Sequence, residues 1–167
     1  MKSVSIMDIA MEERESARAL SVLAYGSKGG HWDQLMLLRS AFDGVGVMTF
    51  ATTDVQLASA YDVERCVELR DYSRSKPLAI LMGFAETFAL VYRLRPDVLV
   101  STGAAPGLLL LLWARVFGAH TIWIDSIANA EKLSLSGSLA RFCANRVVTQ
   151  WQHLASDGKA EYWGSVL

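Results

Sequence analysis

Short apolar runs alternate with segments of helical periodicity along most of this 167-residue chain. This alternation limits the possible folds more than any other feature, because strands that alternate with helices are typical of an α/β domain built on a parallel sheet. Residues 1–18 lack such a pattern and are predicted to form a flexible tail, which leaves residues 19–167 as one domain. The predicted strands are Leu20–Tyr25, Val45–Thr49, Arg65–Leu69, Val98–Val100, His120–Asp125 and Val147–Gln150. One predicted helix follows the loop after the first strand, where Leu35, Leu38 and Phe42 recur at helical spacing. The other predicted helices are Pro77–Leu94, Leu108–Phe117 and Ser138–Ala144.

Composition narrows the functional classes. The net charge is −1, from 16 basic and 17 acidic residues, and no basic run is present, so nucleic acid is not an expected partner. Cys66 and Cys143 lie far apart without the spacing of metal ligands, and we expect both to be reduced, buried thiols of a cytosolic protein.

Neither a signal peptide nor a membrane span is expected. Acidic residues stand near the amino terminus, where a signal peptide needs an apolar stretch. The two longest apolar runs, residues 78–94 and 106–117, are interrupted by Glu86 and Arg115 and do not reach the roughly 20 apolar residues of a membrane span.

Three loops follow predicted strands at the edge of the sheet where ligands of open parallel sheets bind. The first is Gly26-Ser27-Lys28-Gly29-Gly30-His31, whose glycines allow close approach of the backbone and whose following helix favours an anion such as a diphosphate. It matches neither the Walker A phosphate loop of nucleoside triphosphatases nor the G-x-G-x-x-G motif of dinucleotide-binding proteins. His31 stands at the helix entrance, where a neutral imidazole could accept a proton from a sugar hydroxyl. The alternative is a histidine that only hydrogen-bonds the loop.

The second loop, residues 101–107, has hydroxyl groups and glycines before a helix, although such turns are common. The third, residues 125–137, is long for an α/β connection, and long loops at the ligand end are usually functional. Lys132 could pair with a phosphate or could simply be solvated.

No D-x-D motif of metal-dependent glycosyltransferases occurs, and neither G-x-S-x-G nor H-E-x-x-H is present, so neither a metal site nor a serine hydrolase is predicted.

Four segments in order resemble one protein family. They are Gly26-Ser27-Lys28-Gly29-Gly30-His31, Pro96-Asp97-Val98-Leu99-Val100-Ser101-Thr102-Gly103, Ser126-Ile127-Ala128 with Leu133-Ser134-Leu135-Ser136-Gly137, and Val148-Thr149-Gln150-Trp151. The series resembles the acceptor-side, membrane-associated subunit of the two-subunit N-acetylglucosaminyltransferase of dolichol-linked oligosaccharide synthesis. The likeness is greater still to bacterial exopolysaccharide proteins of the PssD type, and it extends over about residues 20–167.

The resemblance implies a Rossmann-like parallel sheet with helices on both faces, equivalent to the N-terminal half of a GT-B glycosyltransferase. It also implies inverting sugar transfer to a polyprenyl-diphosphate-linked sugar, with a separate small subunit that binds the UDP-sugar donor, and no cofactor. Carried over by position, His31 is the candidate catalytic base. The candidate acceptor-binding residues are Gly26, Ser27, Lys28, Gly29, Gly30, Ser101, Thr102, Gly103, Ser126, Asn129, Lys132 and Ser134.

Many bacterial members of this family have an amino-terminal membrane span, and no such span is expected in this chain. We therefore expect peripheral contact with the cytoplasmic face of the plasma membrane, made by apolar helices such as residues 78–94, although that helix could equally pack only against the sheet. Two other functions are compatible with the sequence. One is a non-catalytic membrane scaffold that recruits a catalytic partner. The other, a sugar-nucleotide epimerase of the same architecture, is disfavoured because it needs both domains in one chain.

Overall fold

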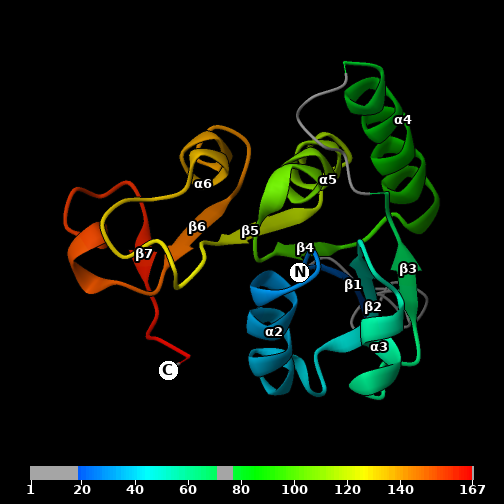
Figure 1. The fold of residues 1–167 in the computed structure, drawn as a ribbon, viewed down its shortest axis with the longest axis horizontal. Coiled ribbons are helices and arrows are strands. Elements are labelled where there is room, and N and C mark those ends of the chain that lie inside the picture. Colours follow the sequence, from blue (N-terminus) through cyan, green and yellow to red (C-terminus); the bar gives the residue numbers. More distant parts are fainter. Residues whose placement is uncertain (1–18, 71–76, 167) are drawn as a thin grey trace, which may run out of the picture.

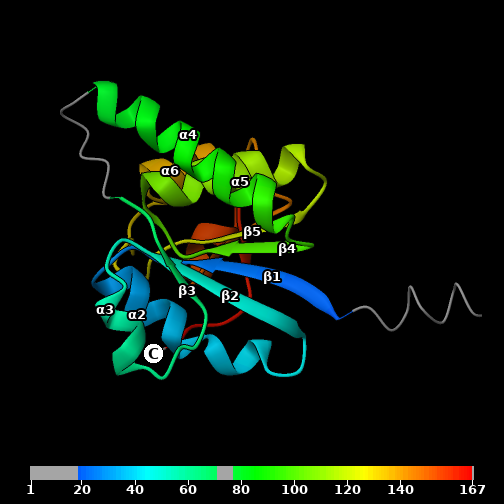
Figure 2. The same cartoon turned by 90° about the vertical axis from the view of Figure 1, so that its right-hand side faces the viewer.

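The computed structural model describes residues 19–70 and 77–166, and it places a seven-stranded sheet between two layers of helices (Figures 1 and 2). The predicted tail, residues 1–18, lies outside the described residues. The strands are β1 (Leu20–Tyr25), β2 (Gly46–Thr52), β3 (Cys66–Glu68), β4 (Val98–Ser101), β5 (His120–Ile124), β6 (Arg146–Thr149) and β7 (Glu161–Tyr162). All neighbouring strands pair in parallel, which confirms the predicted fold class.

The strand order is β3-β2-β1-β4-β5-β6-β7. The chain winds outward from β1 in one direction and then returns to start β4 on the other side of β1. In such doubly wound sheets the reversal between β1 and β4 is the switch point, beyond whose carboxyl ends ligands bind. The topology therefore places the loops after β1 and β4 side by side.

Helices cover both faces of the sheet. Figure 2 shows α4, α5 and α6 on one face and α2 and α3 on the other. The helices are α2 (Gly30–Leu37), α3 (Gln56–Ala60), α4 (Pro77–Leu94), α5 (Ala104–Val116) and α6 (Leu135–Ala140), with 3₁₀ turns η1 (Arg39–Phe42) and η2 (Gln152–Ala155). In residues 19–70 and 77–166, no helix has the length and apolar character needed to cross a membrane.

The alternation of side chains along β1 explains the two layers. Leu23 and Tyr25 point into the core beneath α4, α5 and α6, whereas Ala24 points to the core beneath α2 and α3. Trp32 and Leu35 of α2 fill the second core, and all five side chains are fully buried. Burial of each large apolar side chain contributes roughly 1.5–3 kcal/mol to the stability of the fold. Packing on both faces therefore stabilises β1, the strand that precedes the first loop.

The six predicted strands are confirmed: β1 has the predicted ends, and each of the others is shifted at one end or both. β7 and α3 were not predicted, because two and five residues are too short to show a period. α5 begins at Ala104 rather than Leu108, with Pro106 in its first turn, where proline costs no hydrogen bond. α6 begins at Leu135 rather than Ser138, because the Ser134 hydroxyl caps it by accepting from the backbone N–H of Gly137.

Candidate functional site

A pocket of about 270 Å³ lies beyond the carboxyl ends of β1, β4 and β5. All three predicted loops contribute to it: the first through His31, the second through Ala104, and the third through the residues between β5 and α6. Its lining consists of His31, Ala104, Ser126, Ala128, Asn129, Ser134, Leu135 and Ser136. Four of the predicted site residues (His31, Ser126, Asn129 and Ser134) thus come together at the switch point. The lining mixes polar side chains with apolar ones and carries no Lys or Arg side chain.

The hydrogen bond of His31 fixes which ring nitrogen carries the proton. Nδ1 lies 2.8 Å from the carbonyl oxygen of Thr102. A carbonyl oxygen only accepts hydrogen bonds, so Nδ1 is the donor and must bear the hydrogen. In the neutral ring Nε2 then has the free lone pair, and no other group of the described residues bonds to it. His31 therefore presents a proton acceptor beside the pocket.

Gly103 forms the surface on which the imidazole of His31 lies. A Cβ atom at this position would stand 2.2 Å from Cε1 and 2.3 Å from Nδ1 of His31, which leaves no room for any side chain. Gly103 also has a φ of 149°, a value that L-residues rarely adopt. The second loop thus holds the ring on two sides, through the Thr102 carbonyl and through the Gly103 backbone.

The side chains of Ser101 and Thr102 form hydrogen bonds inside the protein. Both side chains are fully buried, and the Thr102 hydroxyl donates to the backbone oxygen of His31 at 2.7 Å. The Ser101 hydroxyl accepts from the backbone N–H of Gly103 at 3.4 Å. These hydroxyls were predicted to bind the acceptor. In the structure the Thr102 hydroxyl joins the second loop to the first, and the Ser101 hydroxyl bonds within the second loop. A direct acceptor contact stays a prediction.

The first loop combines one tight position with open ones. A Cβ atom at Gly26 would stand 2.9 Å from the backbone oxygen of His31, so this position has no room for a side chain. Lys28, Gly29 and Gly30 are exposed, and Ser27 is half-buried. Gly29 precedes α2 with a φ of 78° and makes no side-chain cap. The first turn of α2 therefore offers backbone N–H groups to the solvent beside the pocket.

Asp125, which was not predicted as a site residue, organises the third loop. Its buried carboxylate accepts from the backbone N–H and the hydroxyl of Ser134 at 2.8 and 2.6 Å. It also accepts from the indole N–H of Trp123 at 3.1 Å and from the amide of Asn129 at 3.4 Å. Because Ser134 uses its hydroxyl on Asp125 and on the α6 cap, it shapes the pocket rather than offering a free group. Ser126 accepts from the backbone N–H of Ala128 at 3.3 Å and keeps its own hydrogen to donate.

Residues after β6 hold the outer side of the same loop. The indole N–H of Trp151 donates to the Ile127 oxygen at 2.8 Å, and Nε2 of His153 lies 2.7 Å from the Ala130 oxygen. A sequence shows strands and loops but not which distant polar side chains meet, so neither contact was predicted.

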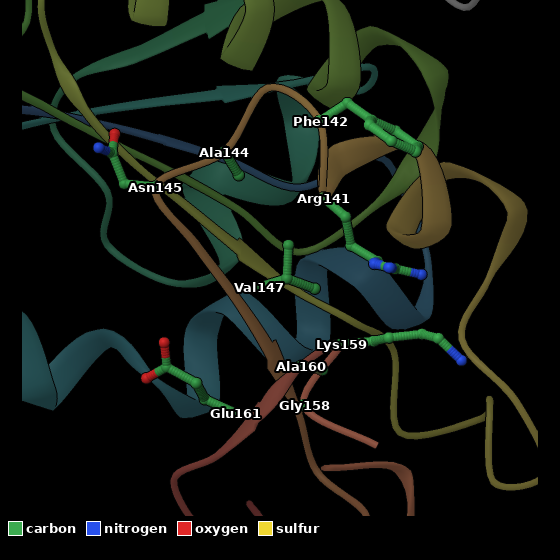
Figure 3. A pocket seen from close by; sticks show the side chains of 9 residues that line it. All are labelled: Arg141, Phe142, Ala144, Asn145, Val147, Gly158, Lys159, Ala160 and Glu161. Carbon is green, nitrogen blue, oxygen red and sulfur yellow. The ribbon is translucent and has the colours of Figure 1, made fainter. Parts of the chain in front are cut away.

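Lys132 lines a different pocket from His31. It lines a separate hollow with Arg141 and Lys159, and an adjoining hollow of about 300 Å³ lies between α6 and β7 (Figure 3). Three charged residues line the adjoining hollow: Glu161, which pairs with Arg146 at 2.9 Å, Lys159, which pairs with Asp157, and Arg141. A phosphate contact of Lys132 stays a prediction, and Lys132 is not among the residues that line the His31 pocket.

Burial disfavours the thiolate form of both cysteines. Burial, with a smaller contribution from the Glu68 charge, raises the pKa of Cys66 to about 11, and burial also raises the pKa of Cys143. Within residues 19–70 and 77–166, no group of three or more His, Cys, Asp or Glu side chains is arranged to hold a metal ion.

Residues 24–166 match the sequence model of a family described as "Oligosaccharide biosynthesis protein Alg14 like". The chain belongs to the Alg14-like family. Among its relatives is the UDP-N-acetylglucosamine transferase subunit ALG14 of Eremothecium gossypii, 25% identical over 87% of this chain and 79% of that protein. Human ALG14 is 22% identical over 96% of this chain and 87% of the relative. The greater likeness to bacterial PssD-type proteins stays a prediction.

Solved structures share the fold of this Alg14-like chain. MurG of Acinetobacter baumannii superposes with a TM-score of 0.68 at 14% identity, over 86% of this chain and 45% of MurG. A UDP-N-acetylglucosamine 2-epimerase from Rickettsia bellii gives a TM-score of 0.66 at 12% identity, over 89% of this chain and 46% of the epimerase. The chain thus spans less than half the length of these structures, and the likeness supports the predicted equivalence to one Rossmann-like half.

Proposed function

We propose that this Alg14-like protein is the acceptor-binding subunit of an inverting glycosyltransferase that transfers a sugar from UDP to a polyprenyl-diphosphate-linked sugar. The observation that carries the proposal is the His31 side chain. Thr102 and Gly103 hold it with Nε2 free beside a pocket at the switch point whose lining includes hydroxyl and amide groups. Relatives described as UDP-N-acetylglucosamine transferase subunits support the reaction class.

The pocket suits a hydroxyl-rich ligand more than a charged one. Its lining offers hydroxyl, amide and imidazole groups and no cationic side chain. The diphosphate of the acceptor would lie at the helix entrances instead. Both α2 and α5 begin after a glycine, without a side-chain cap, so their backbone N–H groups favour an anion. The acceptor sugar and its diphosphate would therefore use adjacent parts of one site.

The transfer step needs a base on this subunit. The acceptor hydroxyl oxygen forms a bond to the anomeric carbon of the donor sugar, on the face opposite UDP. The bond to UDP breaks with its electron pair, and the hydroxyl proton passes to Nε2 of His31. General-base assistance of this kind typically contributes 10²–10⁴-fold.

A partner subunit would supply the donor site. Solved structures with this fold are more than twice as long as the matched chain, which supports a half-enzyme. The UDP-sugar would therefore be bound mainly by a separate small subunit, and the transferase would be active only as a complex.

We test this proposal by reconstitution with the small UDP-sugar-binding subunit from the same source. The pair should transfer sugar from UDP-N-acetylglucosamine to a polyprenyl-diphosphate-linked sugar, as measured by product chromatography. The isolated chain should show neither transfer nor calorimetric binding of the nucleotide sugar. A micromolar UDP-sugar site on the isolated chain, or a pair without transfer, would contradict the half-enzyme assignment.

The outer face of α4 supports the proposed membrane contact. This outer face consists of Leu81, Met82, Phe88 and Tyr92, all exposed, with Leu81 at 65%. Arg95 lies over the ring of Tyr92 at 4.7 Å and over that of Phe117 at 4.1 Å. Aromatic and aliphatic side chains beside an arginine suit the interface of an anionic bilayer. We therefore propose that the protein sits on the membrane surface through α4, on the cytoplasmic face.

A charge on the α4 outer face should weaken this contact. Leu81→Asp should lower binding to vesicles of phosphatidylcholine and phosphatidylglycerol about 10-fold or more, because burial of one leucine contributes roughly 1.5–3 kcal/mol. The measurement is vesicle co-sedimentation at low and high salt. Leu37→Asp is the matched control, since Leu37 is 61% exposed on α2, on the opposite face. Equal binding of both variants would contradict the proposed surface.

A further inference from the structure

Two buried glutamines donate to the same backbone oxygen. Nε2 of Gln34 lies 3.2 Å from the carbonyl oxygen of Asp125, and Nε2 of Gln150 lies 3.3 Å from it. Gln34 is 3% exposed and Gln150 is 5% exposed. A carbonyl oxygen has two lone pairs, so this oxygen is fully used by the two side chains. Asp125 is therefore fixed at the end of β5 through its backbone as well as through its carboxylate.

The two glutamines differ in their second contact. Oε1 of Gln34 accepts from the backbone N–H of Ile127 at 3.2 Å, within the third loop. Oε1 of Gln150 accepts from the backbone N–H of Val166, near the carboxyl end of the described chain. Gln34 thus bonds the chain on both sides of Ser126, which lines the pocket. Gln150 joins Asp125 to a segment that contributes nothing to that lining.

The chemistry requires an amide at position 34. The Asp125 oxygen only accepts and the Ile127 N–H only donates, so the bridging side chain must offer one donor and one acceptor. This pair of partners also fixes which end of the Gln34 amide is nitrogen. Glutamate could serve Ile127 but not the Asp125 oxygen, and an apolar side chain could serve neither. A buried N–H without a partner is unfavourable, so losing Gln34 should release the loop.

Gln34 lies on α2 three residues after His31, about one helical turn away. The first turn of α2 carries the proposed base, and the next turn carries the group that holds the third loop. Movement of the loop relative to α2 would change the distance between an acceptor hydroxyl and Nε2 of His31. Misplacement by about 1 Å can cost on the order of 10²-fold in rate.

We infer that Gln34 is a positioning residue, which sets the third loop against the helix of His31 and so places the acceptor sugar for transfer. This inference rests on the proposed function. It assigns acceptor placement to a side chain whose hydrogen bonds go to the backbone of Asp125 and Ile127.

The test compares two identical substitutions in the complex with the partner subunit, Gln34→Met and Gln150→Met. Both keep the side-chain length and remove one donor to the same Asp125 oxygen. Gln34→Met should raise KM for the acceptor about 10-fold and lower kcat, with KM for the UDP-sugar within about twofold of wild type. Gln150→Met should change each constant less than about twofold. Unchanged acceptor KM in Gln34→Met, or the same rise in both variants, would overturn the inference.

Amide hydrogen exchange supplies a readout that needs no activity. In the isolated full chain, exchange at Ile127 should become about 5- to 10-fold faster in Gln34→Met and stay near wild type in Gln150→Met, because only the first loses the bond to that N–H. If Gln34→Met does not fold, Gln34→Asn serves, since its amide is one methylene too short to span both partners. Slow exchange at Ile127 in a folded variant would overturn the inference. A wild-type pair without transfer would count against the proposed function alone.

Discussion

His31→Ala should reduce turnover of the reconstituted pair by about 10²–10⁴-fold while the chain stays folded and bound to its partner. The reason is the position of the ring. Nδ1 donates to the Thr102 oxygen, so Nε2 is the free acceptor, and it lies beside the pocket where the acceptor hydroxyl is proposed to bind. Alanine removes the proton acceptor but leaves the α2 backbone intact. The measurement is single-turnover transfer at saturating donor and acceptor.

His120→Ala is the control, because His120 is exposed at the start of β5, at the opposite end of the strand from the pocket. His153 is unsuitable, since its ring contacts the Ala130 oxygen of the third loop. Two outcomes would change the role assigned to His31. An active His31→Ala pair would remove the base role, whereas a variant that is inactive because it no longer binds the partner would favour the scaffold alternative.

The fold could be predicted from sequence because parallel strands buried on both faces leave a simple trace. Leu20–Tyr25 and Val98–Val100 read as short apolar runs, and both became neighbouring central strands. The prediction from sequence was less complete for the last edge strand and for one helix end. β7 has only Glu161 and Tyr162, too few residues for any pattern to stand out. α5 also begins earlier than predicted. Ala104 and Ala105 belong to the helix, although in the sequence they stand in a glycine-rich segment that is typical of a turn.

The site could be predicted only as far as topology determines it. Loops that follow parallel strands lie at one edge of the sheet, and β4 separates β1 from β5, so His31 and Ser126 could be expected near one pocket. The roles of individual polar side chains could not be predicted in this way. The Thr102 hydroxyl turns inward to the His31 oxygen, and Gln34 reaches across to Asp125 from a position that reads as an ordinary helical glutamine. Such buried contacts join residues far apart in sequence, and nothing local in the sequence records them.

Gly103→Ala should lower turnover about 10²-fold, although position 103 itself carries no reacting group. The added Cβ would overlap the His31 ring, at 2.2 Å from Cε1, so the ring must leave its place above the second loop. Displacement breaks the Nδ1 bond to Thr102, which had fixed both the tautomer and the direction of Nε2. A loss near 10²-fold is the scale expected when a catalytic group is misplaced by about 1 Å.

Gly118→Ala separates this effect from backbone strain. Gly118 also has a positive φ, 88°, but a Cβ there would meet nothing within 4 Å. Each alanine should lower the free energy of unfolding by about 1–3 kcal/mol, because an L-residue is strained at such a φ. Urea unfolding measures that shared cost, and steady-state kinetics of the pair measures turnover. Only Gly103→Ala should lose activity, and its loss should not add to that of His31→Ala, since a ring that is absent cannot be displaced. A Gly103→Ala pair with wild-type turnover would show that the ring position seen here is not the one used in transfer.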